Sequence, residues 1–230
     1  MRITEIFHSI QGEGELTGVP SVFIRTAGCN LRCGWCDTRY ASWEPTGDEL
    51  SIDEIIARVT PHPTRFVVIT GGEPMIAPGI HDLAARLAVL GKHITIETSG
   101  TVPPAGVACH LASVSPKLSN SRPAPDTPGG WYERHERTRQ APTTITEWLS
   151  KYPYQLKFVV SSLEDADEIR DLLGHLGTSV PPEKVLLMPE GINEAQLREH
   201  GELVIDLCKQ YGWRYCDRLH IRLFGSRRGV

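Results

Sequence analysis

The sequence predicts an α/β fold in the form of an incomplete barrel of about six strand–helix units. Short runs rich in β-branched residues alternate with segments whose apolar residues recur at helical spacing, which is typical of parallel strands joined by helical crossovers. The chain has 230 residues, fewer than the roughly 250 of a complete eight-unit barrel. No G-x-G-x-x-G motif follows the first predicted strand, so a doubly wound open sheet is the second choice.

Seven segments have the composition of strands, and most of them end in a cluster of glycine, serine or proline. Ligands of parallel α/β sheets bind at the carboxyl ends of the strands, so these clusters predict that the functional loops share one edge of the sheet. The predicted strands lie within residues 21–28, 65–72, 92–100, 110–117, 154–160, 184–191 and 218–225.

Two helices are predicted in the first half of the chain. Ser51 and Glu54 have the spacing of a capping box and predict a helix over residues 51–59. Pro78 begins a second helix, which Gly91 is placed to end. The residues expected to face the core are Ile52, Ile55, Ile56 and Val59 in the first helix, and Ile80, Leu83, Ala84 and Leu87 in the second.

Two more helices are predicted in the second half. Ser162 is placed to cap one of them, and Asn193 with Gln196 forms a capping box for the other. The residues expected to face the core are Leu163, Ala166, Ile169 and Leu173 in the first, and Leu197, Val204, Leu207 and Tyr211 in the second.

Residues 118–142 interrupt the alternation of strands and helices. They are rich in proline, glycine and charge, which predicts an insertion or a mobile flap within a single domain spanning residues 1–230. We expect no association with membranes, because the apolar runs are too short to span a bilayer. The N-terminus has no features of a targeting peptide, which predicts a cytoplasmic protein. A net charge of -4 disfavours general nucleic-acid binding.

Three cysteines, Cys29, Cys33 and Cys36, follow directly on the predicted strand at 21–28. A structural zinc ion takes four protein ligands, and no fourth cysteine lies nearby. A cubane 4Fe–4S cluster needs one ligand for each iron, so three thiolates leave one iron open. The C-x3-C-x2-C spacing also excludes a C-x2-C redox pair acting alone. We expect buried free thiols at the remaining cysteines, Cys109, Cys208 and Cys216.

The cysteine spacing, with the aromatic Trp35 before the last cysteine, resembles the signature of the radical S-adenosylmethionine enzymes. In that superfamily the open iron binds the amino and carboxylate groups of S-adenosylmethionine. The "TGGEP" turn at residues 70–74 resembles the turn that meets the methionine amino group and implicates Gly72. "SPK" and "LMPE", at the ends of two other predicted strands, resemble the segments that bind the ribose and adenine. The cofactor-binding residues implied there are Ser115, Pro116, Lys117, Leu187, Met188, Pro189 and Glu190.

The segment "SIQGEG" and the C-terminal "HIRLFGSRRGV", taken with "TGGEP", resemble the 7-carboxy-7-deazaguanine synthase family. The resemblance covers most of the chain outside the insertion. It implies a radical lyase that contracts the ring of 6-carboxytetrahydropterin to 7-carboxy-7-deazaguanine and releases ammonia, a step of queuosine and deazapurine biosynthesis. It also implies a homodimer, Mg²⁺ as a further cofactor, and a reductant protein such as a flavodoxin.

The resemblance further implies a substrate pocket. Gln11 and Glu13 could pair with the donor–acceptor edge of the pterin, and the planar fork of Arg25 suits a carboxylate. From the residues alone, an exposed turn and a surface ion pair would be expected instead. Thr38 matches the position of a magnesium ligand, whereas Arg227 and Arg228 are expected in a solvated tail. The implied substrate-binding residues are Ile10, Gln11, Gly12, Glu13, Arg25, Thr70, His220 and the carboxylate of Val230.

Two other functions share part of these motifs. Activases of glycyl-radical enzymes have the cysteine and GGEP motifs, but they act on a protein and need an open groove. A non-enzymatic iron–sulfur electron carrier or sensor needs no S-adenosylmethionine site. No residue is assigned as a catalytic acid or base.

Overall fold

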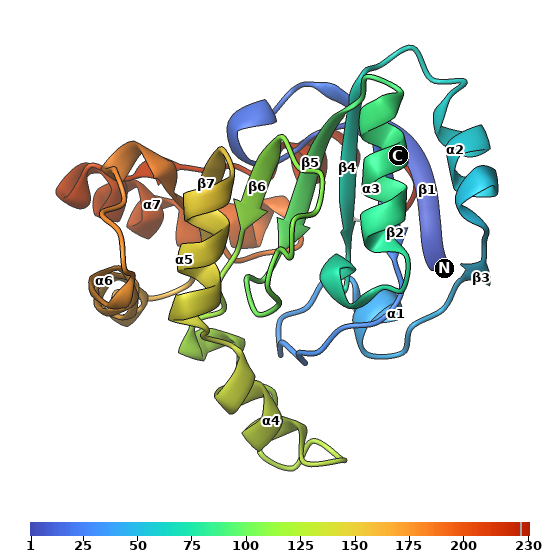
Figure 1. Cartoon of the computed structure of the whole chain (residues 1–230). Coiled ribbons are helices and arrows are strands. Elements are labelled where there is room, and N and C mark those ends of the chain that lie inside the picture. The colour runs from blue at the N-terminus through green and yellow to red at the C-terminus, as the bar shows by residue number, and fades with distance from the viewer. Residues whose placement is uncertain (226) are drawn as a thin grey trace.

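The computed structural model describes residues 1–225 and 227–230 and contains one sheet of nine strands (Figure 1). The strand order is β3-β1-β2-β4-β5-β6-β7-β8-β9. The strands are β1 (Arg2–Ile10), β2 (Pro20–Thr26), β3 (Asp48–Glu49), β4 (Phe66–Gly71), β5 (His93–Thr98), β6 (Leu111–Val114), β7 (Tyr154–Val160), β8 (Val185–Pro189) and β9 (Arg214–Tyr215).

The pairing of the strands decides between the two predicted folds. From β2 through β4 to β9 all neighbours are parallel and follow one another in chain order. A doubly wound sheet reverses its strand order at a switch point, and this order has no reversal. The sheet therefore winds in one direction, as an incomplete barrel does. The prediction of parallel pairing is wrong only at the N-terminal edge, where β1 runs antiparallel to β2 and β3.

Helices cover the sheet, with α3 and α5 in front of it in Figure 1 and α4 projecting from the body. None of the helices in the described ranges is long and apolar enough to cross a bilayer. The α-helices are α1 (Arg39–Ser42), α2 (Ile52–Val59), α3 (Ile80–Val89), α4 (Trp131–Thr138), α5 (Pro142–Lys151), α6 (Glu164–His175), α7 (Glu194–Tyr211) and α8 (Leu219–Phe224). Short 3₁₀ helices are η1 (Gly14–Leu16), η2 (Pro74–Ile76), η3 (Ser119–Ser121) and η4 (Pro182–Lys184).

The capping signals are borne out at two helices and fail at a third. Ser51 and Glu54 form a reciprocal capping box at α2, and the Asn193 side chain accepts the Gln196 N–H at α7. At α6 the predicted cap is wrong, because the carboxylate of Asp165, rather than Ser162, accepts the N–H groups that precede the helix. Leu163 consequently points outward and is 62% exposed.

Residues 118–142 contain η3 and α4, and their role as an insertion or a mobile flap stays a prediction. Two further expectations are corrected. The predicted strand at 218–225 is wrong, since these residues form α8, with helical bonds from Ile221 N to Arg218 O and from Gly225 N to Ile221 O. Cys208 and Cys216 are buried free thiols as expected, whereas Cys109 is only half-buried.

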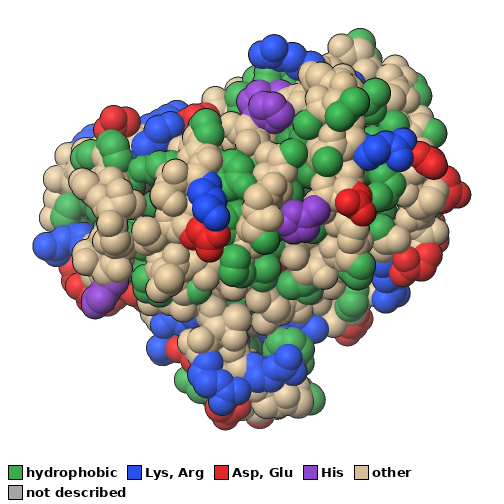
Figure 2. Space-filling model, viewed as in Figure 1, with side chains coloured by type: hydrophobic (Ala, Val, Ile, Leu, Met, Phe, Trp, Pro, Cys, Tyr) green, Lys and Arg blue, Asp and Glu red, His purple; other side chains and the backbone are tan. Residues whose placement is uncertain are grey.

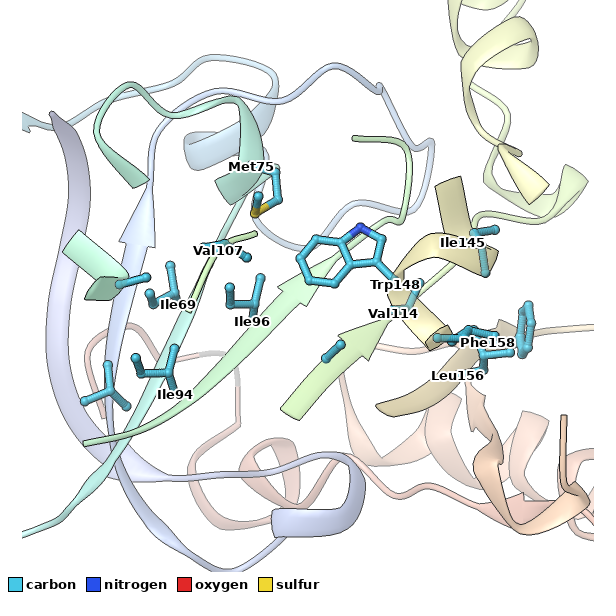
Figure 3. Close-up of a cluster of buried hydrophobic side chains, with 14 of the residues drawn as sticks. Ile69, Met75, Ile94, Ile96, Val107, Val114, Ile145, Trp148, Leu156 and Phe158 are labelled. Atoms are coloured by element: carbon cyan, nitrogen blue, oxygen red, sulfur yellow. The ribbon is translucent and has the colours of Figure 1, made fainter. Parts of the chain in front are cut away.

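The core lies between the sheet and its helices (Figure 3). Apolar residues of β4 to β7, among them Ile69, Ile96 and Phe158, belong to one buried cluster with Trp148 of α5. The indole of Trp148 is fully buried, and its N–H donates to the carbonyl of Val102 at 2.9 Å. This packing fixes the strands against one another and therefore fixes the loops at their carboxyl ends.

Candidate active site

A cavity of about 280 Å³ lies where the carboxyl ends of the parallel strands meet. β1, the loop after β2 and the C-terminal segment also contribute to its walls. All of the predicted site residues line this cavity except Pro116 and Leu187. Side chains alternate along a strand, so Met188 faces the cavity while Leu187 is buried in the core on the other face of β8. The individual roles of the lining residues stay predictions.

Cys29, Cys33 and Cys36 line one wall of the cavity as free thiols. Burial raises the pKa of the Cys29 and Cys33 thiols to about 12, so both need a nearby positive charge to ionise. The iron ions of a cluster supply that charge. The N–H of Leu31 points at Cys29 Sγ at 3.4 Å. Within residues 1–225 and 227–230, no three His, Cys, Asp or Glu side chains are close enough to hold a single metal ion. Three free thiols on one cavity wall match the donor set of a 4Fe–4S cluster, in which each thiolate binds a different iron.

Gly72 allows the TGGEP turn to lie against the cysteine loop. A Cβ atom at Gly72 would stand 2.1 Å from the carbonyl oxygen of Gly28 and 2.8 Å from Cys29 Cβ. The N–H of Glu73 donates to the same Gly28 carbonyl at 2.9 Å. The turn and the first cysteine thus form one rigid corner of the cavity, with main-chain groups close to the cluster site.

Hydrogen bonds of Glu73 connect the TGGEP turn to the end of β5. Its carboxylate is fully buried and accepts hydrogen bonds from Thr98 Oγ1, from Ser99 N and Oγ, and from Met75 N, at 2.6 to 3.2 Å. Ser99 Oγ also bonds to Thr101 Oγ1, which accepts from the Asn30 amide at 2.9 Å. Asn30 follows Cys29, so the network links the GGEP glutamate to the cysteine loop.

β1 contributes both apolar and polar side chains to the cavity wall. Because residues of a strand alternate, Glu5, Phe7 and Ser9 of β1 all line the cavity, and Gln11 lines it just after the strand ends. Phe7 stacks on Phe23 with ring centroids 4.9 Å apart and an interplanar angle of 8°. A planar bicyclic ring would match such a wall.

Arg25 lies in the cavity wall and not on the surface. Its Nε donates to Glu5 Oε1 at 2.7 Å, and the Tyr40 hydroxyl donates to the same oxygen at 2.8 Å. The side chains of Arg25 and Glu5 are 16% and 18% exposed, so the expectation of a surface ion pair is wrong. Glu5 and Tyr40 fix the orientation of the guanidinium.

Glu13 is the centre of a buried charge network. Its carboxylate binds Lys157 Nζ and accepts from Arg218 Nε at 3.3 Å, and His220 Nε2 lies 3.9 Å away. Burial alone would raise the pKa of Glu13, but the positive charges of Lys157 and Arg218 outweigh it and lower that pKa well below its usual range. Glu13 therefore stays ionised, and the expected exposed turn is wrong.

Several residues that line the cavity were not predicted from the sequence: Glu5, Phe7, Phe23, Tyr40, Glu97, Lys157 and Arg218. Glu97 of β5 accepts from Gln11 Nε2 at 3.1 Å and from Thr70 Oγ1 at 2.8 Å, which couples two predicted residues. Lys157 of β7 and Arg218 bind Glu13. A charged residue inside an otherwise apolar strand is the signal that could have found Glu97 and Lys157. Arg218 had no such signal, because its segment was predicted as a strand.

The C-terminal segment contributes to the cavity wall. Val230, Arg227 and Arg228 line it, and the Arg228 guanidinium lies 3.5 Å from the centroid of the Tyr40 ring. Both arginines are exposed, as the predicted solvated tail requires, although they also border the cavity. At the other end of the segment, Leu219 N donates to the Gly12 carbonyl at 2.9 Å.

Thr38 lines the cavity beside the last cysteine, and its hydroxyl lies 3.8 Å from Cys36 Sγ. It precedes α1 without capping it through its side chain. An ordinary capping role therefore does not account for the hydroxyl.

Comparison with known proteins agrees with this geometry. Residues 23–117 match the model of the radical SAM superfamily. The chain is 44% identical to the 7-carboxy-7-deazaguanine synthase of Halobacterium salinarum over 97% of this chain and 90% of that protein. It is also 44% identical to the synthase of that name from Rhodopirellula baltica, over 99% of this chain and 88% of that one.

Solved structures are similar as well. The crystal structure of QueE from Escherichia coli superposes with a TM-score of 0.69 at 29% identity, covering 95% of this chain and 94% of that one. Streptococcus suis SuiB bound to S-adenosylmethionine, at 17% identity and a TM-score of 0.54, shares the fold over 84% of this chain and 48% of that one. With full-length relatives at this level of identity and all three signature cysteines on one cavity, the chain belongs to the 7-carboxy-7-deazaguanine synthase family of radical S-adenosylmethionine enzymes.

Proposed function

We propose that this protein converts 6-carboxytetrahydropterin to 7-carboxy-7-deazaguanine with loss of ammonia. The observation that carries the proposal is the single cavity that Arg25, Glu13 and the stacked Phe7–Phe23 pair line together with the three cysteines. The cavity combines a cation for a carboxylate, hydrogen-bonding groups for an amide edge and a flat apolar surface. The names of the full-length relatives support the same reaction.

Cys29, Cys33 and Cys36 would bind the 4Fe–4S cluster. Gly72, Ser115, Lys117 and the segment 188–190 would bind S-adenosylmethionine. When bound, these two groups supply a carbon-centred radical that removes a hydrogen atom from C6 of the pterin. The protein itself places C6 of the pterin within about 3–3.5 Å of the radical and excludes water from the site.

The substrate would lie with its ring on the Phe7–Phe23 wall. Among the described residues Arg25 is engaged only through Nε, so its Nη groups are available to the substrate carboxylate. The ionised Glu13 can accept two N–H groups from the pterin edge, and Gln11, oriented by Glu97, can donate and accept beside it. The C-terminal carboxylate of Val230 and the imidazole of His220 complete the polar rim.

We also propose that Mg²⁺ binds at Thr38. Magnesium prefers oxygen ligands and retains several waters, so the Thr38 hydroxyl and substrate oxygens suffice as partners. The adjacent Asp37 is bound by Arg218, which leaves Thr38 as the oxygen ligand offered by the cysteine loop. A metal there would orient the substrate carboxylate.

The alternative of an activase is disfavoured, because the site is a cavity of about 280 Å³, which suits a small molecule, whereas a protein substrate needs an open groove. A homodimer and a reductant such as a flavodoxin remain part of the proposal. Basic side chains gather on the lower projection in Figure 2, which is α4 in Figure 1, and they would favour an acidic reductant.

The test is anaerobic reconstitution followed by incubation with the pterin, S-adenosylmethionine, Mg²⁺ and a reductant, with chromatography of the products. We expect the deazaguanine to form without net consumption of S-adenosylmethionine. Arg25→Lys keeps the positive charge but loses the planar guanidinium that can bind a carboxylate through two N–H groups. KM for the pterin should therefore rise by about tenfold, while S-adenosylmethionine binding is unchanged. Cleavage of S-adenosylmethionine with the pterin untouched would favour an activase. Absence of S-adenosylmethionine binding would favour an electron carrier.

A further inference from the structure

The segment 118–142 contacts the cysteine loop through a buried histidine. α4 is a polar helix in which His135 is completely buried, whereas the other residues of the helix are half-buried or exposed. A buried imidazole loses hydration and therefore needs partners for both ring nitrogens. Both partners are present, and one of them belongs to the cysteine loop.

The hydrogen bonds fix the tautomer of this imidazole. The backbone N–H of Arg32 donates to His135 Nδ1 at 3.2 Å, so Nδ1 carries no proton. The ring proton therefore sits on Nε2, which lies 2.9 Å from Ser121 Oγ. The Ser121 hydroxyl donates its own hydrogen to the Leu118 carbonyl at 2.6 Å. Ser121 Oγ can thus accept from Nε2, and each donor in the chain has one acceptor.

The same segment binds the other side of the middle cysteine. The N–H of Gly34 donates to the Ser121 carbonyl at 2.9 Å, so the two N–H groups that flank Cys33 both bond to residues of the segment 118–142. Gly34 lies close to this segment, because a Cβ there would stand 2.7 Å from the Arg122 carbonyl oxygen. The Trp35 indole N–H adds a bond to Asn120 Oδ1 at 3.2 Å.

Trp131, at the start of α4, contacts the same loop from outside. The guanidinium of Arg32 lies 3.9 Å from its ring centroid, and that of Arg134 lies 4.1 Å away. Such cation–π contacts contribute modestly at exposed sites. The Arg32 guanidinium also donates to the carbonyls of Cys29 and Leu31 at 2.9 and 2.8 Å, so the Arg32 side chain connects the cysteine loop to Trp131.

We propose that His135 is a positioning residue for the iron–sulfur cluster, and that with Ser121 it holds the loop around Cys33 in the conformation that binds iron. Groups that orient metal ligands without touching the metal commonly matter 10- to 100-fold for metal affinity. The inference rests on the cluster that the proposed function requires. It does not depend on the identity of the substrate.

The experiment compares His135→Phe, His135→Asn and Ser121→Ala with wild type and with Arg137→Gln, an exposed position on the same helix. Each chain is reconstituted anaerobically. The measurements are iron and sulfide per chain, the rate at which a chelator removes iron, and the electron paramagnetic resonance spectrum of the reduced cluster. Thermal unfolding of the cluster-free chain monitors the fold.

We expect His135→Phe to lose iron about tenfold faster than wild type, and Arg137→Gln to match wild type. His135→Asn keeps an acceptor near the Nδ1 position, so it should lie between the two. If His135→Phe does not fold, His135→Asn and Ser121→Ala still test the proposal, because His135→Asn keeps an acceptor for the Arg32 N–H and Ser121→Ala keeps the imidazole itself. Iron loss at the wild-type rate in the folded variants overturns it. A variant that retains its cluster but does not convert the pterin would count against the proposed function. It would also contradict the role proposed here for His135.

Discussion

The guanidinium of Arg218, close to the C-terminus, binds the carboxylate of Asp37, the residue that follows Cys36. The two residues are 181 positions apart in the chain. The same guanidinium also donates to Glu13 and to the Gly191 carbonyl. One side chain, only 7% exposed, thus joins the cysteine loop, the substrate-facing turn and the loop after β8.

Arg218→Gln should therefore destabilise the cluster-free chain by about 3 kcal/mol, because it removes the charged hydrogen bonds of a buried guanidinium to Asp37, Glu13 and the Gly191 carbonyl. Urea unfolding measures this directly. Arg222→Gln is the matched control, since Arg222 pairs with Asp217 at the surface with side chains 41% and 31% exposed, and its loss should cost at most about 1 kcal/mol. Equal stability of the two variants would contradict the role given to Arg218.

Gly72→Ala should prevent the TGGEP turn from approaching the cysteine loop. The added methyl group would meet backbone atoms, the Gly28 carbonyl at 2.1 Å above all, and these cannot move aside as a side chain could. We expect S-adenosylmethionine binding by the reconstituted protein to be lost. Gly174→Ala is the control, because Gly174 sits inside α6 and a methyl group there would meet no atom of another segment within 4 Å. That variant should bind normally and be up to about 1 kcal/mol more stable.

Glu73→Gln tests the buried hydrogen-bond network of Glu73 in the TGGEP turn. The carboxylate accepts four hydrogen bonds, so an amide would turn its NH₂ group toward donors and leave buried groups unpaired. The loss should be on the order of 2 kcal/mol in thermal or urea unfolding. The exposed Glu44→Gln should leave the midpoint unchanged. A midpoint for Glu73→Gln equal to that of wild type would show that the network is not needed.

Local signals in the sequence were sufficient for much of the fold. The strands β2 and β4 to β8, the capping box at Ser51 and the apolar face of α3 are each encoded within about ten residues, and the structure confirms them. The cysteine and TGGEP motifs are local as well. That is why the positions around the cavity could be named from the sequence.

What the sequence did not reveal depends on distant partners. Glu13 and Lys157 are 144 positions apart, and neither segment contains a sign of the other. Residues 218–225 alternate in polarity as a strand would, yet they form α8 because Arg218 is held in the interior and only Ile221 of the helix is buried. The polar composition of 118–142 suggested a flap, since nothing local shows that His135 has partners in the cysteine loop.

His135 gives a last prediction, on the pH dependence of stability. Burial lowers the pKa of its imidazole to about 4, and the cations of Arg139, Lys117 and Arg122 act in the same direction, while Glu136 opposes them. In the unfolded chain a histidine titrates near pH 6.5. Between these values the unfolded state binds a proton that the folded state does not, so stability falls as the pH is lowered through this window.

Unfolding of the cluster-free chain by urea at pH 7.5, 6.5, 5.5 and 4.5 measures this effect. Between pH 6.5 and 4.5, wild type should lose about 2 kcal/mol more than His135→Asn, which has no imidazole to protonate. His81→Asn, an exposed histidine on α3, should keep the wild-type slope. Parallel slopes for wild type and His135→Asn would mean that the imidazole takes up its proton without disturbing the bonds to Arg32 and Ser121, and the tautomer assigned to it would then be wrong.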